Sequence, residues 1–268
     1  MNKTFALLFL PLLLCQCTGR NSGAKGEIDT IATPDSTTVA DTIPSGAKKL
    51  MEAYPDKVVA YQDGNLVMTN GYHIVYDDSI EKDYITMLDN SDPQDMFAME
   101  YNTRNGESPE YLADAGRSRC EELFKVMYGK TENEARSNLV TVEWFGQRVP
   151  FTSVNGAADS LRLVAKALGC MPNYEKYLKK ASTFYWRKVR GAKRQSAHSY
   201  GIAIDINIDY SNYWLWSNNN ASETDSIKYE NRIPLAIVEV FEHYGFIWGG
   251  RWYHYDTMHF EFRPELLK

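Results

Sequence analysis

Two residues with metal-binding side chains lie in the stretch SAHSYGIAIDINI, residues 196–208. From residue 201 onward, isoleucines alternate with small or polar residues, which is the period of a β-strand. The isoleucines predict a side that faces the core. Asp205 therefore points to the opposite side, where the small side chain of Ala203 leaves room for an ion, and His198 lies on the loop just before the strand.

A second predicted strand, DTMHFEF, covers residues 256–262. Its apolar residues at 258, 260 and 262 alternate with His259 and Glu261, which therefore face the other way. If the two strands are neighbours, His198, Asp205 and His259 converge. Two imidazoles and one carboxylate suit a catalytic zinc with a fourth position open for water. The sequence thus predicts one Zn²⁺ per chain.

Such a metal brings the pKa of its bound water to about 7 and polarises a carbonyl group, which is the chemistry of amide hydrolysis. The reaction also needs a base. Asp256 precedes His259 by three residues, and we expect its carboxylate to contact the water without occupying the metal. Glu261 lies two residues beyond His259 and is expected to orient a ligand.

Each of these residues also has an ordinary interpretation. A single histidine is usually a surface or core residue, and an aspartate after an isoleucine-rich strand often caps a turn. The zinc interpretation therefore depends on the three proposed ligands lying together on matched strand faces.

The elements that would position this site follow from hydrophobic periodicity. Residues 58–68 and 71–78 look like short strands with a turn at Asp63-Gly64, and residues 109–129 look like one amphipathic helix. Within this region Asp95, Glu100 and Asp114 are interpreted as solvated charges. The region is expected to be a supporting lobe or the wall of a substrate groove.

The second half of the chain alternates between strand and helix patterns. Residues 140–154 predict a strand or hairpin, residues 156–170 a helix, and residues 232–245 a later helix with Pro234 in its first turn and Gly245 at its end. We expect an α+β fold: a small, mostly antiparallel sheet that carries the zinc site, flanked by helices, with an N-terminal accessory lobe.

The first 17 residues predict export. Lys3 precedes an apolar stretch at residues 5–14 that is too short to span a bilayer. A leucine-rich stretch that ends in cysteine resembles the lipobox of bacterial lipoproteins, and Cys17 is the expected lipid site, with Cys15 as its rival. A cleaved secretory peptide is the alternative. The predicted location is the cell envelope, with the chain anchored to a bacterial membrane and facing the periplasm or the exterior.

The remaining domain boundaries follow from composition. Residues 18–49 are rich in Thr, Ser, Gly, Asp and Pro and predict a flexible tether. It is followed by the accessory lobe at 50–139 and the catalytic domain at 140–268. The net charge of −6 disfavours nucleic acid as a partner, and nothing implies a protein partner. Cys120 and Cys170 could pair or remain free.

Two motifs in this order resemble a known family. SAHSYGIAID is similar to the S-x-H-x-x-G-x-A-x-D signature of the D-alanyl-D-alanine carboxypeptidase family of zinc peptidases. GGRWYHYDTMHFEF resembles the ending of the branch that includes phage L-alanyl-D-glutamate endopeptidases. The resemblance covers about residues 140–268. It implies that His198, Asp205 and His259 bind zinc and that Asp256 is the catalytic carboxylate.

The resemblance also implies supporting residues. An arginine upstream of the first motif holds a substrate carboxylate or steadies the oxyanion; Arg187 matches best and Arg190 is the rival. Ser196 matches the signature serine, and Trp252 matches the aromatic before the final motif, where core packing explains it equally well. The basic run at 187–194 could instead be a solvated loop.

The substrate that the resemblance implies is the stem peptide of peptidoglycan. Stem peptides carry several carboxylates, which cations beside a metal cleft would recognise. The aromatic residues Tyr213, Trp214 and Trp216 either stack on glycan sugars or pack in a loop. Carboxypeptidase and endopeptidase activity both remain open. The alternative from another class is a catalytically silent peptidoglycan-binding lipoprotein that retains the fold.

Overall fold

The computed structural model describes residues 42–104 and 108–268. The export segment, with Cys15 and Cys17, lies outside the described residues, so export and lipid attachment stay predictions. Helix α1 (Ser45–Ala53) begins before the expected end of the tether, and its Ala47 is fully buried. Across the described ranges, no helix combines the length and apolarity that crossing a membrane requires.

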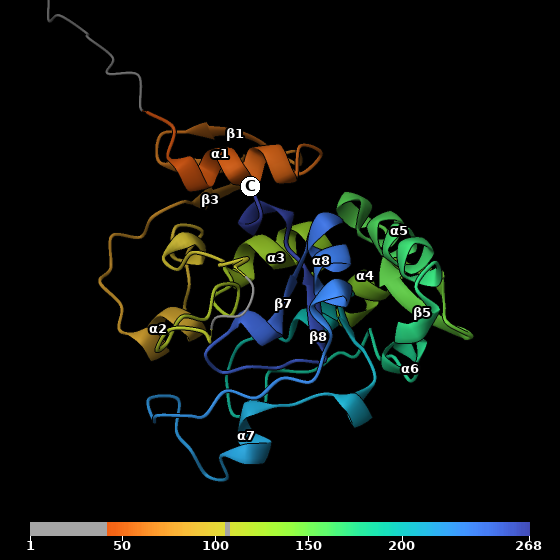
Figure 1. Ribbon diagram of the computed structural model, residues 1–268. Coiled ribbons are helices and arrows are strands. Elements are labelled where there is room, and N and C mark those ends of the chain that lie inside the picture. Colours follow the sequence, from red (N-terminus) through yellow and green to blue (C-terminus); the bar gives the residue numbers. More distant parts are fainter. Residues whose placement is uncertain (1–41, 105–107) are drawn as a thin grey trace, which may run out of the picture. The chain divides into compact units, whose positions relative to one another are not determined.

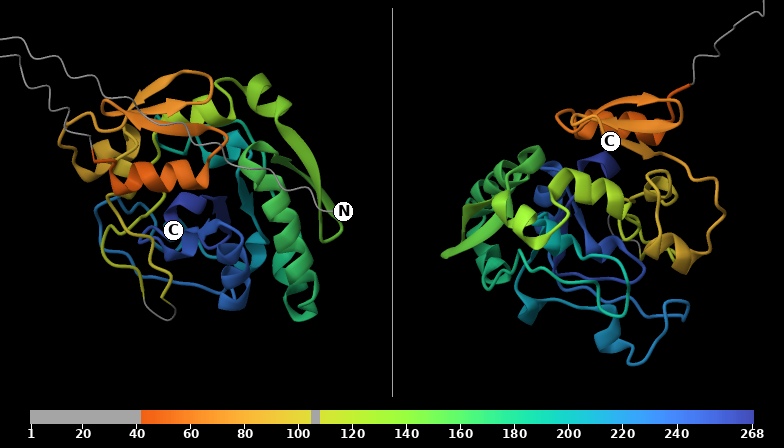
Figure 2. Two further views of the ribbon diagram at one scale, coloured as in Figure 1. Left: turned by 90° about the horizontal axis from the view of Figure 1, so that it is seen from above. Right: turned by 180° about the vertical axis from the view of Figure 1, so that it is seen from behind.

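The first elements form a small layer at one end of the described unit. Strands β1 (Val58–Gln62), β2 (Asn65–Met68) and β3 (His73–Val75) pair antiparallel in the order β1-β2-β3, and helix α1 lies beside them (Figure 1; Figure 2). Asp63 and Gly64 both have positive φ, which is the geometry of a tight hairpin turn. The predicted turn is confirmed.

The long helix predicted at residues 109–129 is wrong in its first half. Helix α3 covers only Glu121–Tyr128, and the residues before it are turns and loops. Leu112 and Gly116 have φ of 58° and 97°, values that no right-handed helix contains. Asp114, interpreted from sequence as a solvated charge, is fully buried. The chain leaves the helical path here because Asp114 accepts hydrogen bonds from distant residue His254.

The hairpin and the two helices predicted after residue 139 are confirmed. Strands β4 (Leu139–Trp144) and β5 (Gln147–Thr152) form an antiparallel pair. Helix α5 (Ala157–Gly169) packs on this pair and on α8 (Leu235–His243), as the green and blue helices of Figure 1 show. The apolar stripes that predicted these helices therefore face a common core.

The central sheet contains β6 (Ala203–Asp205), β8 (His259–Phe262) and β7 (Phe246–Trp248), all antiparallel, in the order β6-β8-β7. Strand β6 is shorter than predicted. Ile204 and Ile206 are buried, but Ile208 is 52% exposed, because the side chain of Asn207 accepts a hydrogen bond from Asp209 and starts a 3-10 turn.

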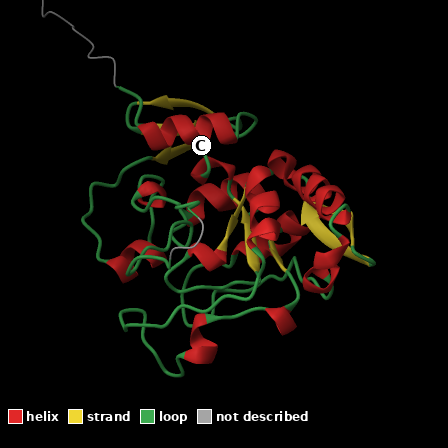
Figure 3. Cartoon of the chain, viewed as in Figure 1, coloured by secondary structure: helices red, strands yellow, loops and turns green. Residues whose placement is uncertain are grey.

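The remaining elements are short and separated by long loops (Figure 3). They are α2 (Tyr84–Asp89), η1 (Asp95–Phe97), α4 (Glu132–Ser137), η2 (Val154–Gly156), η3 (Pro172–Tyr174), α6 (Glu175–Leu178), η4 (Ala197–Tyr200), η5 (Ile208–Tyr210), α7 (Trp214–Ser217), η6 (Gly249–Arg251) and η7 (Pro264–Leu266). The fold is thus α+β, built from small antiparallel sheets and helices.

One hydrophobic core joins the two halves of the described chain. It runs from Ala47 in α1 to Phe262 in β8, and Lys268 donates a hydrogen bond to the Glu52 carbonyl at 2.8 Å, so the C-terminus lies beside α1 (Figure 1). The boundary proposed between residues 139 and 140 stays a prediction.

Candidate metal centre

The pairing of β6 with β8 sets Asp205 directly opposite His259. Asp205 Oδ1 lies 3.0 Å from His259 Nδ1 and 3.2 Å from His198 Nε2. One donor atom from each of the three residues lies within 4.8 Å of the other two, a group that could hold a metal ion. The structure therefore brings together the three residues that the sequence proposes as ligands.

The second ring nitrogen of each histidine has its own partner. His198 Nδ1 lies 2.5 Å from the Thr183 carbonyl oxygen, which only accepts, so Nδ1 carries the proton and Nε2 is available. His259 Nε2 lies 3.4 Å from the Glu261 carboxylate, which leaves Nδ1 to face Asp205. Outer hydrogen bonds of this kind fix the ring orientation of metal-binding histidines.

The charges around these residues favour a bound cation. Burial opposes ionisation of His259, yet its hydrogen bonds to Asp205 and Glu261 raise its pKa to about 10. Burial also opposes the charge of Asp205, but the two histidines hold the pKa of Asp205 below its ordinary value. The metal-free centre thus retains a proton that a metal ion would displace. Two nitrogens and one carboxylate oxygen fit zinc.

Asp256 lines the same cavity as the three candidate ligands. Its Oδ1 atom is buried without a hydrogen-bond partner. Burial and the charge of Asp205 raise the pKa of Asp256 to about 7, so this carboxyl group exchanges protons near neutral pH, as a general base requires. A Cβ atom on Gly249 would lie 2.5 Å from the Asp256 carbonyl oxygen, which explains physically why a glycine stands there.

Glu261 is fully buried between two guanidinium groups. Arg119 Nη1 lies 3.2 Å from one carboxylate oxygen and Arg263 Nη1 lies 3.1 Å from the other. Burial opposes the charge, but Arg119, the hydrogen bond from His259 and Arg263 lower the pKa of Glu261 to about 2. An ionised, fully paired carboxylate suits orientation of His259 better than proton transfer.

The centre opens into a cavity of about 410 Å³. Every site residue expected from sequence lines it, except Glu261, which lies behind His259, and Cys17, which is outside the described residues. The lining includes Arg187, Ser196, His198, Asp205, Trp252, Asp256 and His259, together with Arg117, Arg119, Arg190, Arg194, Tyr213, Trp214, Trp216 and His254.

The basic run at 187–194 is a small hairpin at the edge of this cavity. Val189 N–H donates to the Arg194 carbonyl at 3.0 Å, and the turn contains Gly191 at φ 78°. Arg194 is buried and pairs with Asp89 at 2.6 Å. Arg187 and Arg190 are exposed and both line the cavity, so the run is only partly a solvated loop.

Arg187 is held in place by a residue that sequence reasoning missed. Its N–H donates to the Ser199 hydroxyl at 2.8 Å, and its carbonyl accepts from Ser196 N–H at 3.0 Å. The charge of Arg187 is also among the effects that lower the pKa of Asp256, although burial raises that pKa more strongly. This electrostatic effect on Asp256 distinguishes Arg187 from Arg190.

The aromatic residues of the site divide into packed and exposed ones. The Trp252 ring lies 5.5 Å from the His259 ring, and its Nε1–H donates to the Ala115 carbonyl at 2.6 Å. Trp214 is 4% exposed, whereas Trp216 is 49% exposed. Trp252 and Trp214 therefore form walls, and Trp216 is the aromatic side chain most accessible to a ligand.

Residues 190–262 match the sequence model of a family described as D-alanyl-D-alanine carboxypeptidase. No curated protein and no solved structure matches the chain. The matched segment contains His198, Asp205, Asp256 and His259, and it is narrower than the resemblance at residues 140–268. The match supports this family of zinc peptidases at a coarse level, and with it a peptidase that acts on peptidoglycan-like substrates.

Proposed function

We propose that this chain is a zinc peptidase that hydrolyses peptide bonds in peptidoglycan stem peptides. The observation that carries the proposal is the meeting of His198, Asp205 and His259 beside Asp256 in one cavity. One zinc ion held by those three residues would activate a water molecule and polarise the scissile carbonyl when bound.

Asp256 does the proton transfer in this proposal. Its unpartnered Oδ1 accepts a proton from the attacking water, and the same carboxyl group passes it to the leaving amine. Arg187, on the hairpin at the cavity edge, is placed to hold a substrate carboxylate or to steady the oxyanion. Glu261 and Thr183 keep the two imidazoles in the required tautomers.

The preference for an acidic peptide follows from the cations of the cavity. Among the residues that the structure describes, neither Arg187 nor Arg190 has a carboxylate partner. Two such guanidinium groups match a substrate with two carboxylates. Both carboxypeptidase and endopeptidase action fit this arrangement. We further propose an exported, lipid-anchored protein, which the sequence of residues 1–17 supports.

The test is a digest of purified muropeptides followed by mass spectrometry, with metal analysis of the same protein. We expect about one zinc per chain and the loss of a terminal D-alanine or of a stem fragment. The identity of the released fragment distinguishes carboxypeptidase from endopeptidase. Metal-free protein that leaves muropeptides intact would support the silent, binding-only alternative.

A pair of variants separates the base from a ligand. Asp256→Asn should keep zinc and lose turnover by about 10² to 10⁴-fold, because proton transfer contributes an effect of that size. His259→Ala should lose both zinc and turnover. If Asp256→Asn remains active, Asp256 is not the base.

A further inference from the structure

Residues 113–119 form what we call the supporting segment, which runs along the part of the chain that carries Asp256 and His259. Its backbone accepts hydrogen bonds from Tyr253 N–H at Ala113, from the Trp252 indole at Ala115 and from the Arg263 guanidinium at Gly116. The segment lies outside the stretch that matches the family. Its contacts therefore come from a part of the chain that the family comparison leaves unexplained.

The Asp114 carboxylate is hydrogen-bonded to His254, the residue two positions before Asp256. One carboxylate oxygen accepts the backbone N–H of His254 at 3.0 Å, and the other lies 2.6 Å from its Nδ1. His254 is 1% exposed and lines the cavity. Both the backbone and the ring of this residue are thus fixed by one side chain, and the direction of the chain toward Asp256 is fixed with them.

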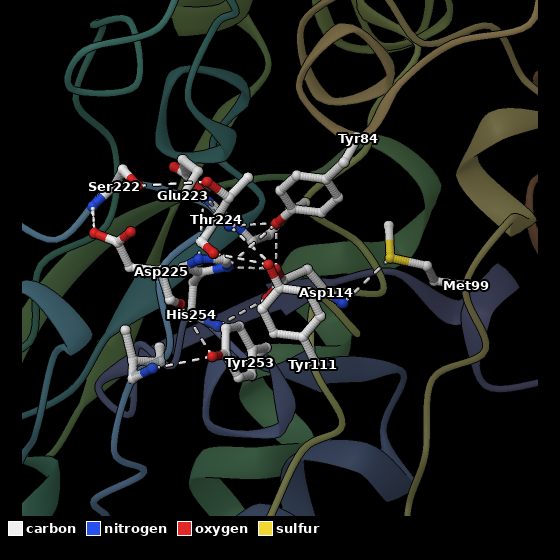
Figure 4. Close-up of polar contacts among 12 residues, drawn as sticks. Tyr84, Met99, Tyr111, Asp114, Ser222, Glu223, Thr224, Asp225, Tyr253 and His254 are labelled. Carbon is white, nitrogen blue, oxygen red and sulfur yellow. Dashed lines mark hydrogen bonds and ion pairs between the residues drawn. The ribbon is translucent and has the colours of Figure 1, made fainter.

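A wider cluster keeps Asp114 charged and in place (Figure 4). Tyr84 donates a hydrogen bond to its carboxylate, and Arg117 lies 3.2 Å away while also bridging to Glu223 with two 2.8 Å hydrogen bonds. Burial opposes ionisation, but Arg117 and His254 hold the pKa of Asp114 below its ordinary value. An ionised carboxylate keeps both oxygens available as acceptors for His254.

Arg119 acts on the proposed ligand His259 through a separate set of contacts, by way of Glu261. Its Nη1 donates to the Gly116 carbonyl at 3.1 Å and to the Glu261 carboxylate at 3.2 Å. The same Glu261 oxygen faces His259 Nε2. Arg119 therefore fixes the position of the carboxylate oxygen whose hydrogen bond orients His259 Nδ1 toward Asp205.

The path of the segment depends on close packing at Gly116. This glycine has φ 97°, and a Cβ atom there would lie 2.3 Å from Ile247 Cδ1 on β7. The segment is therefore pressed against the central sheet between Asp114 and Arg119, which fixes the spacing between the two contacts.

From these contacts we propose that Asp114 and Arg119 are positioning residues of the metal centre. Asp114 holds Asp256 through His254, and Arg119 holds His259 through Glu261. The proposal deepens the proposed function. Its first half, the Asp114 branch (Asp114, His254 and Asp256), rests on that function. Its second half, the Arg119 branch (Arg119, Glu261 and His259), concerns metal binding alone and is tested without any substrate.

The first experiment measures zinc affinity by competition with a chelator, together with the visible spectrum of the cobalt-substituted full chain. Arg119→Met should weaken zinc binding up to about 10-fold, because loss of a direct outer partner of a ligand costs about 10- to 100-fold and Arg119 acts one contact further out, through Glu261; the cobalt bands should also change. Arg119→Lys should recover part of the affinity. Lys82→Met is the control, because the Lys82 side chain is 3% exposed and pairs with Asp92 and Asp95 away from β8.

The second experiment separates positioning from proton transfer at His254. Its Nε2 has no hydrogen-bond partner and lies 3.6 Å from Glu223. In His254→Asn the side-chain amide can replace Nδ1–H toward Asp114, and nothing replaces Nε2. We expect His254→Ala and Asp114→Ala to lower kcat about 10- to 100-fold with KM and zinc content unchanged, and His254→Asn to restore most of the loss.

The outcomes discriminate clearly. Wild-type zinc affinity in both Arg119 variants, with unchanged cobalt bands, overturns the Arg119 branch. His254→Asn as inactive as His254→Ala overturns the Asp114 branch, because the ring would then act through Nε2. If Asp114→Ala does not fold, the two His254 variants still decide. If the wild type cleaves no muropeptide while Arg119→Met weakens zinc binding, the proposed function fails and the Arg119 branch stands.

Discussion

The raised pKa of Asp256 predicts that this residue lowers the stability of the metal-free protein while serving the proposed reaction. Burial and the charge of Asp205 move its pKa from an ordinary value near 3.8 to about 7. A carboxyl group whose pKa is raised by folding favours the folded state at low pH. That contribution is complete below about pH 4 and is lost as the pH rises through 7.

The size of this effect on the free energy of unfolding follows from the change in the pKa of Asp256. A change from 3.8 to about 7 corresponds to about 4 kcal/mol at 1.36 kcal/mol for each pH unit. The side chain also faces the solvent of the cavity, so we expect about half of this, roughly 2 kcal/mol. Asp256→Asn removes the titration. The metal-free variant should therefore be more stable than the wild type by roughly 2 kcal/mol at pH 8 and equal to it at pH 4.

The assay is urea denaturation of chelator-treated protein at both pH values, followed by tryptophan fluorescence. The pH 4 measurement is the control for any change that does not involve ionisation. Equal stability at pH 8, or the same gain at both pH values, would refute the electrostatic account of Asp256. The zinc-loaded proteins should differ less, because the cation would stabilise the carboxylate.

Three further predictions concern the core and the supporting segment. Gly116→Ala should lower the free energy of unfolding by about 2 to 4 kcal/mol, because the added Cβ atom both strains the backbone and clashes in the core. Gly64→Ala is the control, since Gly64 also has a positive φ but has open space around it. In the same urea titration it should cost only about 1 to 2 kcal/mol. Phe260→Ala should cost about 3 to 5 kcal/mol, because its ring is fully buried in the central sheet; a loss below 1 kcal/mol would contradict that packing. Burial opposes ionisation of Asp114, but Arg117, His254 and Tyr84 together hold its pKa below the ordinary value. The stabilising contribution of Asp114 should be present above about pH 4 and decline as the pH falls further, so the stability difference between wild type and Asp114→Asn should shrink on acidification.

Much of the site could be predicted from sequence because its information is local. Period-two alternation placed Asp205 and His259 on polar strand faces, and the structure pairs these two residues across β6 and β8. The hairpin turn at Asp63-Gly64 and the helix end at Gly245 were equally readable, since both depend on short-range backbone geometry. The predictions that agree with the structure are those that depend on the residues of a single strand or a single turn.

The rest depends on contacts that no local pattern encodes. Residues 109–120 have a fair helical periodicity, yet Asp114 is drawn out of a helix by hydrogen bonds to a residue 140 positions later. A buried aspartate and a solvated one look alike in a single sequence, so Asp114 was misread. For the same reason Arg119 gave no sign that it would meet Glu261. Ile208 was assigned to the core because alternation continues past the true end of β6.

Asp205 and His259 are paired across antiparallel strands, so the metal centre is sensitive to any change of one residue in the register of those strands. Adding a single residue inside β8 would place Phe260 opposite Asp205, and removing one would place Met258 there, so an apolar side chain, not an imidazole, would face the cavity. The loop at residues 218–232, between the two strands, lies in no helix or strand; it is free of this constraint and can change in length. Variants of this scaffold should therefore tolerate odd-numbered insertions in the connecting loops and be inactivated by them in either strand.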